Sequence, residues 1–180
     1  SAPFIDRYRL PWLSRRRDWM VLSQLALLVL VGVLGTIDPA KGTDYTQTMA
    51  LVNLYDGLVF PDSKGNLKPH LAKDWSTSNG GKTYTFTLQD GVKFHSGNTL
   101  TAADVKFSLD RFLDINQGYS GLLSGVLSKD NVTAKDDHTI EFTLDETYSP
   151  FLAILSLLFV VDKQTVLSNK KSGDFGSDGD

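Results

Sequence analysis

The chain has 180 residues, 41% of them hydrophobic and 22% charged, which is the size and balance of one folded domain and excludes a wholly disordered chain. It contains no cysteine, so disulfide scaffolds, zinc fingers, iron–sulfur clusters and thiol catalysis are excluded. Five arginines stand among the first 18 residues and acidic residues prevail from Asp38 onward, a pattern unlike the basic folded face that nucleic-acid binding needs.

The segment from Trp19 to Ile37 has 19 residues without a charge. As a helix rising about 1.5 Å per residue it is just long enough to cross a bilayer, and the arginines before it would hold that end in the cytoplasm. We therefore expect a basic cytoplasmic head at residues 1–18, a signal anchor or transmembrane helix at 19–36, and an extracytoplasmic remainder. Two alternatives stay open, a cleaved secretory signal and a buried first strand at Leu28–Leu34.

Beyond this segment the pattern is mixed α and β. Residues 49–55 predict a helix that is apolar on most sides and ends at Gly57, and such a helix should be buried. Residues 75–78 and 83–88 flank a turn and predict a β-hairpin, because threonines alternate with large apolar residues along the second arm.

A second helix is predicted at residues 102–113, where apolar residues recur at helical spacing. Thr101 and Asp104 provide the hydroxyl and the carboxylate of a capping box at its start. Residues 132–135 and 139–144 then predict a second hairpin.

The last predicted elements are a short buried helix at residues 150–158 and a flexible tail or truncated linker at 171–180, where glycine, serine and aspartate prevail. His70, His95 and His138 lack the spacing of a metal site. The sequence also lacks a nucleophile elbow and a phosphate-binding glycine loop. We therefore expect no catalytic residue, no metal and no cofactor.

Several segments, in order and nearly without gaps, resemble the family 5 extracellular solute-binding proteins, the peptide and nickel receptors of bacterial ABC importers. The resemblance runs from residue 37 to about residue 176. The segments that carry it are Ile37–Ala40, Asn53–Val59, Leu71–Trp75, Gly81–Leu88, Asp90–Gly97 and Thr101–Val105.

The resemblance implies an α/β (mixed α+β) fold. Residues 37–170 would form part of lobe I, the N-terminal lobe of a two-lobed periplasmic-binding-protein type II fold, preceded by one apolar helix. It implies a non-catalytic receptor that closes around an oligopeptide, a dipeptide or a nickel chelate and delivers it to ABC permease subunits, at the periplasmic or extracellular face of the inner membrane. Members of the family are far longer, so we expect these 180 residues to lack the opposing wall of the cleft.

The matched part also implies positions that face the ligand. They fall in the segment after Asp38-Pro39 and in the loop after the capped helix. In the first group the side chains could stack or form hydrogen bonds, although the threonines could equally cap the following helix. The predicted ligand-binding residues are Tyr45, Thr46, Gln47, Thr48, Gly118, Tyr119 and Ser120.

Residues 1–36 resemble a cytoplasmic loop and membrane helix of a muropeptide-type major facilitator permease. Two alternatives to a solute-binding module follow. One is a membrane permease fragment fused to a non-binding lobe, and the other is a permease-interaction domain that captures no solute, because half a cleft excludes little water.

Overall fold

The computed structural model describes residues 38–42 and 45–169. The predicted head at 1–18, the apolar segment at 19–36 and the tail at 171–180 lie outside the described residues. Within the described ranges no helix combines the length and the apolar character that crossing a membrane requires.

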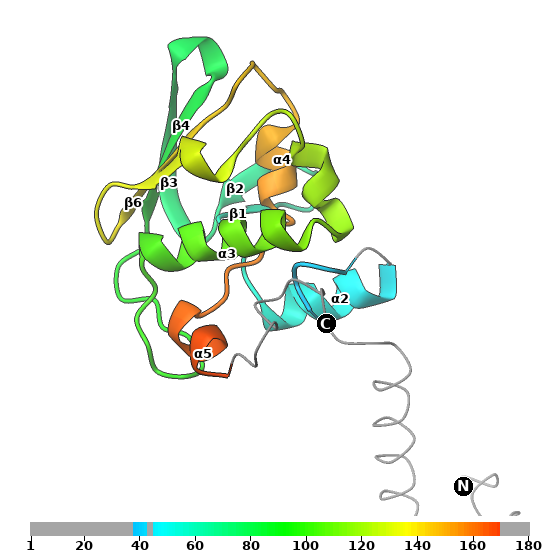
Figure 1. Ribbon diagram of the computed structural model, residues 1–180, viewed down its shortest axis with the longest axis vertical. Coiled ribbons are helices and arrows are strands. Elements are labelled where there is room, and N and C mark those ends of the chain that lie inside the picture. The colour runs from blue at the N-terminus through cyan, green and yellow to red at the C-terminus, as the bar shows by residue number, and fades with distance from the viewer. Residues whose placement is uncertain (1–37, 43–44, 170–180) are drawn as a thin grey trace, which may run out of the picture. The chain divides into compact units, whose positions relative to one another are not determined.

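The described residues form a mixed α+β unit (Figure 1). Its helices are α2 (Tyr45–Leu54), α3 (Ala102–Ile115), α4 (Phe151–Leu155) and α5 (Lys163–Ser168). Short 3-10 helices are η1 (Asn79–Gly81), η2 (Gly118–Leu123) and η3 (Lys129–Asn131). Its strands are β1 (Val59–Pro61), β2 (Leu67–Pro69), β3 (Ala72–Ser78), β4 (Thr83–Leu88), β5 (Val132–Ala134) and β6 (Thr139–Thr143).

The main sheet is antiparallel with the strand order β3-β4-β6-β5, and β1 and β2 form a separate two-stranded ribbon. Both predicted hairpins are confirmed, as β3 with β4 and β5 with β6. The alternation along β4 is also confirmed, since Tyr84, Phe86 and Leu88 are all buried. The sheet therefore has one core-facing side, as the period of two in the sequence requires.

The centre of the core is aromatic. Phe86 of β4 and Phe142 of β6 are diagonal neighbours across the two strands and meet edge to face with ring centroids 5.6 Å apart, and Phe142 meets Phe151 of α4 at the same distance. These three side chains are fully buried. In Figure 1, α3 runs crosswise to the long strands, and it contacts β5 and β6.

The capped helix is confirmed as α3. The Asp104 carboxylate accepts hydrogen bonds from the Thr101 amide at 2.9 Å and from the Thr101 hydroxyl at 2.7 Å. The helix continues two residues past the predicted end, to Ile115, and Asn116 closes it in the left-handed conformation with φ of 50°. The short predicted helix at 150–158 is also present as α4, although only Phe151–Leu155 is helical.

The predicted burial of the helix at 49–55 is wrong for the described residues. Helix α2 buries only Leu51, while Tyr45, Met49 and Leu54 are 80%, 50% and 54% exposed. The apolar residues surround the helix, and the described chain covers only the side on which Leu51 lies.

The segments that precede and follow the β-rich core lie side by side. Gly57, just after α2, forms a bridge with Phe159, and the Val160 amide donates to the Asp56 carbonyl at 2.9 Å. A Cβ at position 57 would lie 3.2 Å from the Leu158 carbonyl oxygen, so only glycine fits this approach comfortably. The segment before α5 is thereby held beside the end of α2.

Candidate functional site

The loop at 38–42 is held by a buried ion pair. Asp38 accepts hydrogen bonds from both terminal nitrogens of Arg111, on α3, at 2.7 and 2.5 Å, and from the Ala40 amide at 2.9 Å. Burial opposes the ionisation of Asp38, but these hydrogen bonds and the nearby positive charges of Arg111 and Lys41 hold its pKa below the ordinary value. The Nε of Arg111 is the one buried side-chain nitrogen or oxygen among the described residues that lacks a hydrogen-bond partner.

The first group of predicted ligand residues begins α2. Tyr45 and Thr46 are exposed, and Gln47 and Thr48 are half-buried. The group also borders the 38–42 loop, because a Cβ on Gly42 would lie 3.4 Å from the Gln47 side-chain oxygen.

The second group follows α3 and lies against the same loop. Gly118 has φ of 61°, and a Cβ there would lie 3.2 Å from the Ala40 carbonyl oxygen. Tyr119 packs at the edge of the core. Ser120 is 3% exposed, and its hydroxyl donates to the Gln117 carbonyl at 2.7 Å. The structure therefore places both predicted groups next to residues 38–42, while their role toward a ligand stays a prediction.

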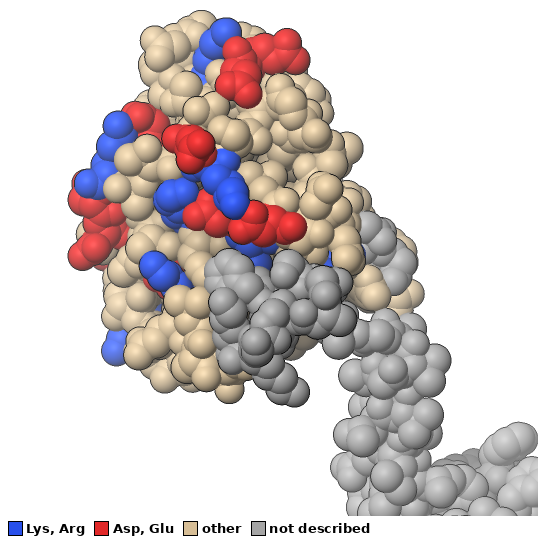
Figure 2. Space-filling model, in the orientation of Figure 1, with Lys and Arg blue, Asp and Glu red and all other residues tan. Residues whose placement is uncertain are grey.

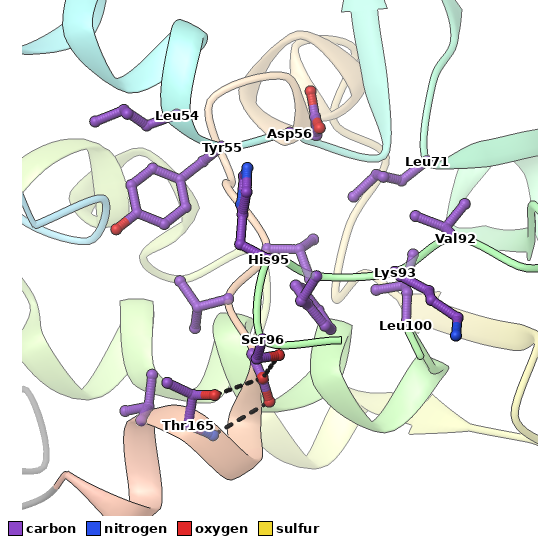
Figure 3. A pocket seen from close by; sticks show the side chains of 15 residues that line it. Leu54, Tyr55, Asp56, Leu71, Val92, Lys93, His95, Ser96, Leu100 and Thr165 are labelled. Carbon is purple, nitrogen blue, oxygen red and sulfur yellow. Dashed lines mark hydrogen bonds between the residues drawn. The ribbon is translucent and has the colours of Figure 1, made fainter. Parts of the chain in front are cut away.

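A groove of about 270 Å³ lies between the end of α2, the 92–100 loop and α5 (Figure 3). Its walls are mostly apolar, and Asp56, Lys93 and His95 add polar groups. The pKa of the Tyr55 hydroxyl is raised, first by burial and then by the charge of Asp38. Sequence reasoning missed this groove, although Val92 and Phe94 in a glycine-bounded loop are an indication of it. The apolar part of its lining includes Leu54, Tyr55, Val92, Phe94, Val160 and Val166.

Asp162 connects the floor of this groove to α5. Its carboxylate accepts from the Ser96 hydroxyl at 2.6 Å, from the side-chain amide of Asn98 at 2.8 Å and from the Thr165 hydroxyl at 2.6 Å. It also caps α5 through the backbone amides of Gln164 and Thr165. Burial raises the pKa of this carboxyl, but the hydrogen bonds together outweigh that effect and hold it far below its usual range. The Asp-x-x-Thr spacing of residues 162–165 is the indication of this cap in the sequence.

Charges on the visible face of the unit are mixed in sign (Figure 2). Lys106 pairs with Asp110 at 2.9 Å, and Lys129 pairs with Asp114. The described residues contain no group of three or more His, Asp or Glu side chains placed to hold a metal ion. The site is therefore a set of apolar and hydrogen-bonding surfaces, which suits recognition of a solute or a protein.

The profile of the family described as "Bacterial extracellular solute-binding proteins, family 5 Middle" matches residues 66–179. The dipeptide-binding protein DppE of Bacillus subtilis (strain 168) is 32% identical over 152 residues, which cover 76% of this chain and 28% of that protein. A probable D,D-dipeptide-binding periplasmic protein of Escherichia coli (strain K12) is 36% identical over 126 residues, covering 67% of this chain and 24% of that protein.

Solved structures of solute-binding proteins share this fold. The substrate-binding domain of an oligopeptide ABC transporter from Bacillus anthracis superimposes with a TM-score of 0.70 at 25% identity, over 76% of this chain and 30% of that one. The murein tripeptide-binding protein of Escherichia coli superimposes with a TM-score of 0.66 at 30% identity, over 75% of this chain and 30% of that one. The chain thus spans less than a third of the length of these relatives.

Proposed function

Because this chain belongs to the family 5 bacterial extracellular solute-binding proteins, we propose that it forms part of the receptor that captures a peptide-class solute for an ABC importer. The observation that carries the proposal is the joint match in sequence and fold over three quarters of the chain to proteins named for binding peptides. The described residues would supply one wall of the binding cleft. The permease subunits of the importer would be the protein partner.

Peptides are the favoured solute, because dipeptides, D,D-dipeptides and murein peptides recur in the names of the relatives. Another relative is named for binding glutathione, which is itself a tripeptide. Others are named for binding deoxycholate or heme, so the choice of solute varies within the family. A nickel chelate, also implied by the family resemblance, has less support because these names do not include nickel. We therefore propose a peptide of a few residues as the solute.

The ligand wall would consist of the two groups that border the 38–42 loop. Tyr45 is 80% exposed and could stack on a ligand without losing a packing contact. Tyr119 packs at the core edge, where its ring would form part of the same wall. A single wall buries one side of a ligand only, so we expect dissociation constants of about 1 mM or weaker, equivalent to about −4 kcal/mol.

The test is an NMR titration of the 180-residue chain with di- to pentapeptides. We expect chemical-shift changes at millimolar peptide concentrations, centred on residues 38–42 and 117–120. The Tyr45→Ala variant should bind the peptide severalfold more weakly. Phe60→Ala, on β1, is the matched control, since Phe60 is a half-exposed aromatic residue outside both groups. Micromolar binding would contradict the single-wall interpretation, and an absence of any shift at tens of millimolar peptide would contradict the ligand role.

We further propose an extracytoplasmic location, in keeping with relatives named as periplasmic proteins, with residues 19–36 as the membrane attachment. Protease added to intact spheroplasts should then digest the described unit, while carbonate washing should leave the chain in the membrane fraction. Release of the chain by the wash would contradict attachment without contradicting the location.

A further inference from the structure

The β3–β4 hairpin ends in η1, at the tip of the longest strands of the sheet (Figure 1). Three successive residues there, Asn79, Gly80 and Gly81, have φ of 50°, 64° and 91°, which lie in the left-handed region. Glycine adopts this region freely, and asparagine is one of the few other residues that adopt it. The Lys82 amide closes the turn by donating to the Asn79 carbonyl at 3.3 Å.

This turn contains the one Asn-Gly pair in the sequence. In such a pair the backbone nitrogen of the glycine can attack the side-chain carbonyl carbon of the asparagine, because glycine has no Cβ to hinder the approach. Asn79 and Gly80 are both exposed. A Cβ at position 80 would meet no atom of the described residues within 4 Å. Water therefore reaches the pair, and the space that the reaction needs is open.

The hydrogen bond that closes the turn also favours this reaction. The Asn79 carbonyl and the Gly80 nitrogen belong to the same peptide group, and the nitrogen attacks after it has lost its proton. Because the Lys82 amide donates to that carbonyl, it stabilises the negative charge that the deprotonated peptide group carries. The folded turn thus supplies an activated nucleophile beside the asparagine side chain.

The side chain of Asn79 is restrained by a neighbouring hydroxyl. Its Nδ2 donates to the Thr83 hydroxyl oxygen at 2.9 Å, and Thr83, the first residue of β4, is only 6% exposed. Ring closure requires the carboxamide to rotate and Nδ2 to leave. A hydrogen bond from Nδ2 to a buried and well-placed acceptor opposes both movements, so it slows the reaction.

We propose that Asn79 is a site of spontaneous covalent modification, a deamidation whose rate the Thr83 hydroxyl limits. The Gly80 nitrogen gives its proton to solvent and forms a bond with Cγ of Asn79. The bond between Cγ and Nδ2 then breaks, and Nδ2 leaves as ammonia after taking a proton from water. A water molecule opens the resulting succinimide ring at either carbonyl, which gives aspartate or isoaspartate. Water is the only co-reactant, and no electron is transferred.

The two products change the hairpin to different extents. Aspartate keeps the backbone and adds one negative charge. Isoaspartate adds a methylene group to the main chain, so the turn loses its left-handed geometry and the hydrogen bond from Lys82. The pairing of Ser78 with Thr83 is the last one before the turn. We expect the hairpin to open from that end after isoaspartate forms, while the centre of the sheet stays folded.

The test is to age the folded 180-residue chain at physiological temperature and mildly alkaline pH, and to follow each asparagine by mass spectrometry of peptides. Asn53 and Asn66 are internal controls, because both are exposed but each is followed by leucine. We expect Asn79 to convert severalfold faster than either control. Treatment with an isoaspartyl methyltransferase should then label the peptide that contains residue 79.

Two variants at position 83 test the restraint. Thr83→Val keeps the branched shape but removes the hydroxyl, and Thr83→Ser keeps the hydroxyl. We expect Asn79 to convert severalfold faster in the valine variant than in the serine variant, with no difference at Asn66. Circular dichroism verifies that both chains are folded during the measurement.

Three results would overturn the inference or its parts. Conversion of Asn79 no faster than that of Asn53 and Asn66 contradicts the modification site. Conversion that occurs only after the chain is unfolded in urea contradicts the reactivity of the folded turn. Equal rates in the two variants at position 83 contradict the role of the hydroxyl. None of these results depends on solute binding, since residues 79–83 belong to neither group of predicted ligand residues.

Discussion

At the scale of single residues, the 38–42 loop depends on one ion pair. The side chains of Arg111 and Asp38 are only 11% and 14% exposed, and the pairing fixes the loop against α3. Since Gly118 touches the same loop, the pair also determines where the loop after α3 can lie. Removing one partner of a buried ion pair is strongly destabilising, because the other charge stays buried without compensation.

We therefore predict that Arg111→Met destabilises the chain by about 3–5 kcal/mol, because it leaves the Asp38 carboxylate buried without its partner. Urea denaturation followed by circular dichroism would measure this. The double variant Asp38→Asn/Arg111→Met should recover part of the loss, since the uncompensated charge is gone. A loss below 1 kcal/mol for the single variant would show that Asp38 finds water or another partner.

Asp162 should make stability depend on pH. Its pKa is lower in the folded chain than the ordinary value of about 4, so its contribution is fully present above about pH 4 and is lost as pH falls toward the folded-state pKa. Asp162→Asn should cost about 1–2 kcal/mol at pH 7, through a weaker α5 cap and weaker bonds to the 96–98 loop. Measured by urea denaturation, the difference between the two chains should shrink from pH 7 to pH 3. A difference in unfolding free energy that stays constant over this pH range would contradict the lowered pKa of Asp162.

At the scale of elements, α2 offers a matched pair of leucines on one helix. Leu51→Ala should destabilise the chain by about 2–5 kcal/mol, since Leu51 is 1% exposed. Leu54→Ala should change stability by only about 0.5 kcal/mol, since Leu54 is 54% exposed. Thermal and urea denaturation would measure both. Equal losses would show that the far side of α2 is covered in the 180-residue chain.

The elements that were predicted correctly are those whose sequence patterns lie within a few neighbouring residues. The alternation in β4 and the Thr101–Asp104 capping box each lie within a few residues, so they were predictable without knowledge of the fold. The burial of α2 was not, because it depends on what packs around the helix and not on the helix alone.

The site was predictable only in part for a related reason. Asp38 and Arg111 are 73 residues apart, and Ser96 and Asp162 are 66 residues apart. Single-sequence spacing carries no information about such pairs. The groove likewise combines loop, helix and strand-end residues from four separate segments. The family resemblance predicted two groups of ligand-facing residues, and the structure places both beside the 38–42 loop, while their contact with a solute stays a prediction.

At the scale of the whole unit, stability should be graded outward from the sheet. Strand β4 is paired on both sides, with β3 and β6, while β1 and β2 form an isolated ribbon of three residues each.

Hydrogen exchange should therefore be slowest in β4, where it requires global unfolding at about 5–15 kcal/mol. The exposed side of α2 should exchange through local opening, several kcal/mol more easily. Exchange followed by mass spectrometry of peptides would compare the two. Amides of α2 that exchange as slowly as those of β4 would contradict this order.

The bridge between Gly57 and Phe159 means that the polypeptide enters and leaves the sheet-containing part at neighbouring points. Such a part can be carried as an insert, because a host chain interrupted at one position needs to open by only a few ångströms to accept it. Exchange of this part between related proteins would replace the sheet while leaving the path of the host chain intact. The same closure makes this part a natural starting point for circular permutation, with new ends in the exposed 62–66 turn.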